Sequence, residues 1–126
     1  MNKEDLIRRW MAKAEEDLEM CRVALEHRPD LVEAICFHAQ QAAEKSIKAL
    51  LVEYDISFRK VHSLVYLLDL VADRLKDAER LYDLAEKLEG YSVEIRYSDT
   101  ELQLTQEDAK KAYHAAVMIK GIIFSR

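Results

Sequence analysis

The side chains best suited to chemistry lie within the segment 35–51, whose spacing predicts an amphipathic helix. His38, Gln41, Lys45 and Lys48 recur at three- and four-residue steps, so they share one face of that helix. An imidazole, a carboxamide and two ammonium groups can together hold a polar or anionic ligand. The opposite face carries short apolar side chains, which let another helix approach closely. The alternative interpretation is a bundle helix with a solvated outer face.

Spacing argues against metal chemistry. His38, His62 and His114 are too far apart in the sequence to be ligands on one helix, and Cys21 and Cys36 lack zinc-type spacing. We therefore expect no metal site and no cofactor, and we interpret the cysteines as buried thiols in a reducing compartment. A histidine-phosphotransfer module is a rival bundle, but the Lys-Gly pair expected after its histidine is missing.

The first predicted helix carries an acidic run at 15–19. The run lacks the Glu-x-x-His pairs of a di-iron bundle, so we interpret it as a solvated face. The net charge of −5, from 19 basic and 24 acidic residues, argues against a protein that binds long stretches of phosphate backbone. The N-terminal residues are charged and no window approaches a membrane span, so we expect a soluble cytoplasmic protein without a membrane partner.

Five amphipathic helices are predicted to position these residues. The first begins at an Asn2 cap and ends at Pro29, and the second runs from an Asp30–Glu33 capping box to about Tyr54. The third begins at His62 or Ser63 and runs to about Leu75. The fourth occupies about 79–95, and the fifth runs from a Thr105–Asp108 capping box to about Ile123. With 2 Gly and 1 Pro in 126 residues, the composition favours long helices over strands. We predict an all-α single domain over 1–126, an up-and-down antiparallel four-helix bundle with an additional fifth helix. Apolar residues in excess of the helical seams favour a homodimer.

Three motifs together resemble the HEPN domain family. They are the run 37–51 with Gln-Gln-Ala-Ala-Glu-Lys at its centre, His62-Ser63-Leu64 with Leu67-Leu68, and Arg96-Tyr97-Ser98-Asp99. The resemblance spans nearly the whole chain. It implies a small helical domain that often dimerises, is often encoded beside or fused to a minimal nucleotidyltransferase, and in some branches is a metal-independent ribonuclease.

The resemblance also implies a groove that holds a nucleotide or the substrate of a partner nucleotidyltransferase. Its ligand-binding residues would be His38, Gln41, Lys45, His62, Arg96 and Tyr97. Lys45 and Arg96 are suited to phosphate oxygens, Gln41 to a base or sugar, and Tyr97 to stacking. The alternative is that Arg96 pairs with a nearby carboxylate and locks the fourth helix, with Tyr97 packed beneath it.

The nuclease branch of the family uses an Arg-x4-6-His motif, in which Arg binds phosphate and His acts as acid or base. After Arg96 the next histidine is His114, too far along the chain, and we interpret the formal match from Arg22 to an exposed His27 as chance. A Gly-rich phosphate loop and paired catalytic Asp residues are also missing, so the chain alone is not expected to transfer nucleotidyl groups. The function expected is a nucleotide- or substrate-binding accessory subunit of a separate minimal nucleotidyltransferase, in a toxin–antitoxin pair. The alternatives are a ribonuclease toxin and a bundle with a protein-interaction role only, so enzymatic activity stays open.

Overall fold

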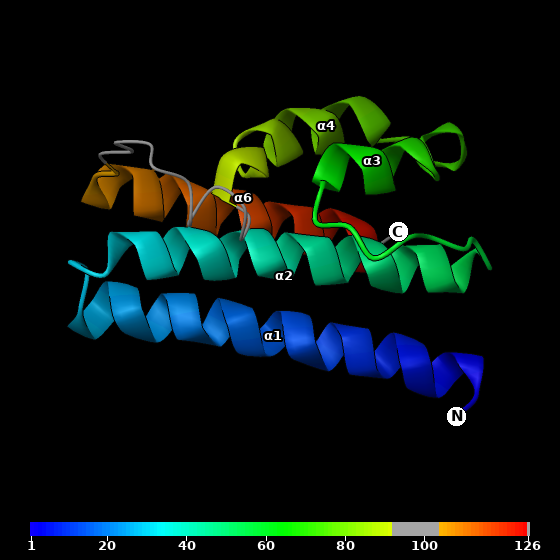
Figure 1. Cartoon of the computed structure of the whole chain (residues 1–126), viewed down its shortest axis with the longest axis horizontal. Helices are drawn as coiled ribbons and strands as arrows, with labels where there is room; N and C mark the ends of the chain where they lie inside the picture. The colour runs from blue at the N-terminus through cyan, green and yellow to red at the C-terminus, as the bar shows by residue number, and fades with distance from the viewer. Residues whose placement is uncertain (92–103, 126) are drawn as a thin grey trace.

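The computed structural model describes residues 1–91 and 104–125, and these contain helices and no strand. Three long helices, two shorter helices and two 3-10 turns follow one another as α1 (Lys3–His27), α2 (Val32–Glu53), α3 (Leu64–Asp69), η1 (Ala72–Arg74), α4 (Ala78–Glu86), η2 (Glu89–Tyr91) and α6 (Gln106–Phe124). Figure 1 shows α1, α2 and α6 along the length of the molecule, with α3 and α4 over one side. No helix of the described part is long and apolar enough to cross a membrane.

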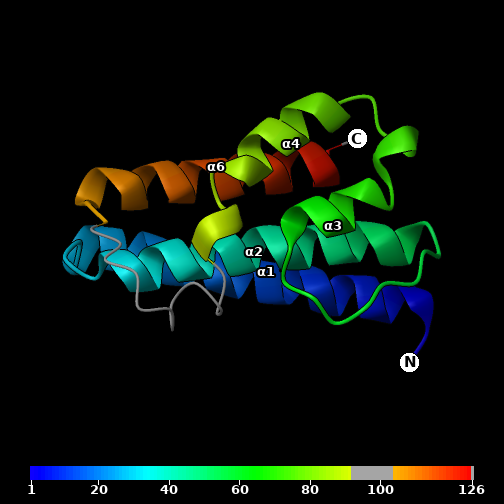
Figure 2. The same ribbon diagram turned by 45° about the horizontal axis from the view of Figure 1, so that its top comes forward.

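The helix directions give the predicted bundle. In both views α1 runs opposite to α2, and α4 runs opposite to α2 and α6 (Figure 1, Figure 2). These four helices form the up-and-down set, and α3 is the additional helix. The connection after α2 folds back along that helix before α3 begins, so α3 runs in the same direction as α2. The all-α bundle class is thereby confirmed.

Helix α2 lies at the centre of the bundle because its small residues allow close contact on two sides. Its packing partners are α1 and α6, with α3 above. Four alanines on this helix are buried, at positions 39, 42, 43 and 49, and α6 also carries buried alanines such as Ala112 and Ala116. Leu64, Leu67 and Leu68 of α3 complete the core, and each fully buried side chain of this size contributes about 1.5–3 kcal/mol.

Local hydrogen bonds define three helix starts as predicted. The Asn2 side chain accepts from a backbone N–H of the first turn of α1, and Ser63 does the same for α3. At α6 the Thr105 hydroxyl accepts from the Asp108 N–H at 3.1 Å, and the Asp108 carboxylate accepts from the Thr105 N–H at 2.9 Å. Each bond satisfies a donor that the helix itself leaves unpaired.

The predicted capping box of α2 is wrong. Its N-cap residue is Leu31, without a side-chain bond. The Asp30 carboxylate instead accepts from Arg28 Nε at 3.0 Å and Nη2 at 2.9 Å. These bonds hold the pKa of Asp30 below its usual value. A neighbouring guanidinium therefore outcompetes the backbone N–H groups for this carboxylate.

The third and fourth helices are shorter than predicted. Helix α3 ends at Asp69 and not near Leu75, since the chain turns through η1. Helix α4 ends at Glu86, and the last part of the predicted range, 92–95, lies outside the described residues. Glu89 leaves the helical path and caps α3: its carboxylate accepts from the N–H groups of Leu64 at 2.7 Å and Val65 at 3.0 Å. The Glu89 carboxylate thus lies at the N-terminus of α3, where a negative charge is favourable, and α4 does not extend to this residue.

Candidate functional site

A buried carboxylate of α1 joins two of the predicted site residues. Asp17, whose side chain is 9% exposed, accepts from His38 Nδ1 at 2.9 Å and from Lys45 Nζ at 2.6 Å. His38 and Lys45 are two turns apart on α2, so both reach the same group on α1. Because Nδ1 of His38 faces a carboxylate acceptor, it carries the proton. The other ring nitrogen, Nε2, is not used in this bond, and the side chain is partly exposed.

A second buried carboxylate organises the other side of the polar face. Glu44 accepts from Lys48 Nζ at 2.8 Å and from His62 Nδ1 at 3.1 Å. Gln40 Nε2 donates to the backbone carbonyl of His62 at 2.9 Å, so the ring and the backbone of this residue are both held. The segment that follows α2 is thereby fixed against the middle of that helix.

Gln41 extends the second of these groups. Its Nε2 donates to Gln40 Oε1 at 2.8 Å. We call the two groups together the α2 polar cluster; its members are Asp17, His38, Gln40, Gln41, Glu44, Lys45, Lys48 and His62. Every buried side-chain N or O atom among the described residues has a partner, so the cluster needs no ligand for its own stability.

Lys48 has a structural position within the cluster. Its side chain is 9% exposed, and Nζ lies 5.4 Å from the centroid of the Trp10 ring and 5.7 Å from that of Phe58. The ammonium group is therefore enclosed by a carboxylate and two aromatic faces. Its burial confirms the Glu44–Lys48 pair that the four-residue spacing permits.

The structure thus holds four of the six predicted ligand-binding residues on or against α2, in two separate hydrogen-bonded groups. His38 and Lys45 meet at Asp17, His62 lies on Glu44, and Gln41 bridges toward Gln40. Arg96 and Tyr97 lie outside the described residues, so the single groove with all six stays a prediction.

Lys45 is already paired, so a phosphate at this place has to share it with Asp17. With neutral histidines the two carboxylates balance the two lysines. The arrangement therefore fixes two imidazole rings and presents them partly to solvent.

The solvated-face interpretation holds for Glu15, Glu16 and Glu19 of α1, which are exposed, and is wrong for Asp17 and for part of α2. In the acidic run of α1 only Asp17 turns inward, three residues after Ala14 and four before Cys21, both buried. That spacing is the signal that identifies Asp17 as an inward residue. On α2 the outer-face interpretation fails for Gln40 and Glu44, which are buried.

The two cysteines and His27 lie where the sequence predicts them to lie. Cys21 and Cys36 are buried free thiols, and burial raises the pKa of each to about 12. His27 is exposed, and the neighbouring Arg22 donates to Glu19 and Glu26. Over 1–91 and 104–125, no three His, Cys, Asp or Glu side chains form a group that could hold a metal ion.

Comparisons with known proteins agree with this geometry. The family model for the HEPN domain matches residues 7–123. A protein of Methanocaldococcus jannaschii named "Putative toxin MJ1304" is 34% identical over 130 aligned residues, which cover 90% of this chain and 83% of that protein.

Two crystal structures have the same fold. TT1696 from Thermus thermophilus superposes with a TM-score of 0.76 at 28% identity and covers 98% of both chains. ST0689, described as an archaeal HEPN homologue, gives a TM-score of 0.74 at 27% identity over 94% of both chains. With a family match over nearly its whole length and this level of identity, the chain belongs to the HEPN domain family.

Proposed function

We propose that this chain is the HEPN component of a toxin–antitoxin pair and acts in the cytoplasm as the binding subunit for a separate minimal nucleotidyltransferase. The observation that carries the toxin assignment is the 34% identity to the M. jannaschii protein, whose name describes a toxin, over 90% of this chain. The nucleotidyltransferase partner follows from the family resemblance. The partner supplies the nucleotidyl-transfer chemistry.

The α2 polar cluster supports a binding role. Two buried carboxylates hold His38, Lys45 and His62 in fixed positions, so little side-chain entropy is lost when a ligand or partner engages them. The rings of His38 and His62 are 29% and 39% exposed, which leaves them accessible. We place the nucleotide, or the partner's substrate, against this face.

A ribonuclease toxin is the second candidate. In its favour, His38 and His62 each direct Nδ1 to a carboxylate, an arrangement that suits general acid–base catalysis. Against it, the ring contacts of His38 and His62 are to carboxylates and not to a described arginine, and Arg22 is bound by two glutamates. An assay on transfer RNA without metal separates the two functions, because cleavage that disappears in His38→Ala or His62→Ala would favour the nuclease.

We further propose that the chain is a homodimer. Several large apolar side chains on α1, α6 and the connection between α1 and α2 are more than a third exposed: Leu6, Met20, Val23, Leu31, Val117 and Met118. Exposed apolar side chains of this kind are often buried at subunit interfaces. Analytical ultracentrifugation tests this, and a monomer at tens of micromolar would contradict it, since specific association commonly falls in that range.

The experiment for the pair is inducible expression of the chain alone and together with the minimal nucleotidyltransferase encoded beside it. Alone, the chain should arrest growth, and the partner should restore growth and co-purify with the tagged chain. Lys45→Ala tests the site, with the exposed Lys110→Ala as the matched control. Absence of such a neighbouring gene, or normal growth with the chain alone, would contradict the proposal.

A further inference from the structure

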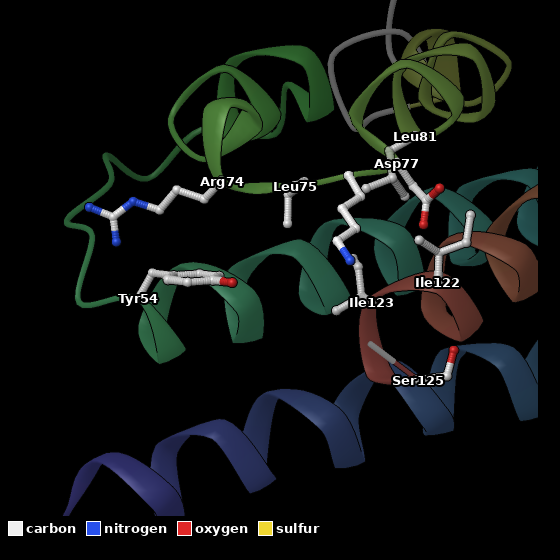
Figure 3. A pocket seen from close by; sticks show the side chains of 9 residues that line it. Tyr54, Arg74, Leu75, Asp77, Leu81, Ile122, Ile123 and Ser125 are labelled. Atoms are coloured by element: carbon white, nitrogen blue, oxygen red, sulfur yellow. The ribbon is translucent and has the colours of Figure 1, made fainter.

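A pocket lies between the ends of α2 and α6 and the start of α4, on the side of α2 away from α1. Its volume is about 410 Å³, and it is enclosed by the end of α2, the segment from η1 to the start of α4, and the end of α6 (Figure 3). It contains no residue of the α2 polar cluster. Sites for small organic molecules commonly measure about 300–1,000 Å³, so this pocket is large enough for one.

The floor of the pocket is aliphatic. Leu75, Leu81, Ile122 and Ile123 line it, and Figure 3 shows them on three separate segments around one space. Leu81 and Ile123 are also buried core residues, which gives the floor a fixed shape. Such a lining binds an apolar body by removing its surface from water.

The rim carries the charge. Arg74 and Lys76 line the pocket and are exposed, and neither forms an ion pair with any described residue. The guanidinium carbon of Arg74 lies 5.4 Å from the centroid of the Tyr54 ring, and Figure 3 shows these two side chains together at one end of the lining. Asp77 contributes one negative charge. The lining residues therefore carry one net positive charge, which matches one anionic group.

We propose that this pocket binds a small organic monoanion with an aliphatic body, a medium-chain carboxylate. The carboxylate is bound by the cations of the rim, of which the Arg74 guanidinium offers paired N–H donors. The chain of the ligand lies over the aliphatic floor. Asp77 disfavours a second negative charge, so a diphosphate fits less well.

The polar groups of the lining also argue against a nucleoside. Beyond the charged residues, Tyr54 and Ser125 bring the only side-chain hydroxyls among the described lining residues, and the Ser125 hydroxyl already donates to the Gly121 carbonyl. Reading a base requires several positioned donors and acceptors. An aliphatic body requires none.

The experiment is an NMR titration of the isotope-labelled full chain with octanoate. We expect saturable shifts of backbone amides at 74–77 and 122–125. The uncharged 1-octanol should bind at least about tenfold more weakly, because it lacks a charge-assisted contact that contributes about 1.5–3 kcal/mol. The doubly charged phenyl phosphate should also bind more weakly, because Asp77 repels its second charge and its body is not an aliphatic chain. Octanoate should also raise the thermal unfolding midpoint, since a ligand that binds only the folded state stabilises it.

The variants test the rim. Arg74→Met with Lys76→Met should weaken octanoate binding at least about tenfold. Lys87→Met, at an exposed lysine that does not line the pocket, should leave it unchanged. Any of three results would overturn the proposal: no saturable shifts, shifts centred on other residues, or equal affinity for octanoate and 1-octanol in the native chain. None of them bears on growth arrest or on the nucleotidyltransferase, which are tested separately.

Discussion

Replacement of Asp17 by alanine should be the most damaging single change at the α2 polar cluster. The carboxylate is buried and accepts two hydrogen bonds, from Lys45 Nζ at 2.6 Å and from His38 Nδ1 at 2.9 Å. The substitution leaves both donors in a largely apolar contact between α1 and α2. The exposed neighbour Glu16, replaced by alanine in the same turn, is the matched control.

The magnitude follows from burial and from the number of bonds. Each charge-assisted bond contributes about 1.5–3 kcal/mol, and removal of one partner of a buried pair costs about 3–5 kcal/mol. Lys45 and His38 are 22% and 29% exposed, so both can turn partly toward water and recover some solvation. We therefore expect Asp17→Ala to lower the free energy of unfolding by about 2–4 kcal/mol. Glu16→Ala should change it by less than about 0.5 kcal/mol.

Urea unfolding followed by circular dichroism at the helical band measures both variants. A double-mutant cycle with Lys45→Met isolates the pair: the second substitution should cost much less once Asp17 is gone. Equal unfolding free energies for Asp17→Ala and Glu16→Ala would refute the reasoning. So would additive costs of Asp17→Ala and Lys45→Met, because additivity means that the two side chains do not interact in solution.

Three further outcomes are expected. Glu89→Ala removes the carboxylate that caps α3 and should lower the free energy of unfolding by about 1–3 kcal/mol. Backbone amides of α3 should then exchange hydrogen faster than those of α1, and uniform exchange rates would contradict this. Cys21 and Cys36 should resist alkylation in the native protein near neutral pH and react after unfolding, since burial raises the pKa of each thiol. Unfolding stability should fall as the pH rises from about 9 toward about 12, because over that range the unfolded chain releases thiol protons that the folded chain keeps. The fall should be shallower in Cys21→Ala with Cys36→Ala, where Tyr82 and Tyr91, whose pKa values burial also raises, still contribute; identical profiles for the variant and the native chain would refute the assignment.

Local signals were sufficient for much of the fold. The caps at Asn2 and Thr105 join residues three apart in sequence, so they can be recognised without knowledge of the tertiary structure. Asp30 has the same spacing to Glu33, but it lies beside Arg28, which binds its carboxylate more strongly. A capping motif therefore predicts a helix start reliably only when no competing cation stands next to it.

The partners within the candidate site required the tertiary structure. The face with His38, Gln41 and Lys45 follows from helical periodicity, and His62 from the family resemblance. Their binding partners are distant in sequence: Asp17 lies 28 residues before Lys45, and His62 lies 18 residues after Glu44. The spacing from Ala14 and Cys21 indicates that Asp17 turns inward from the acidic run of α1, but it does not show which side chains Asp17 binds. Which carboxylate accepts from a given lysine depends on how two helices are rotated against each other, and helix packing decides that rotation.

Calorimetric titration of the two purified proteins tests whether the chain binds a minimal nucleotidyltransferase through the α2 polar cluster, as we propose. We expect saturable binding that weakens at least about tenfold in Lys45→Ala, because a charge-assisted contact is lost, and stays unchanged in the folded Lys110→Ala control. No measurable binding by the native chain, or equal affinity in both folded variants, would contradict it.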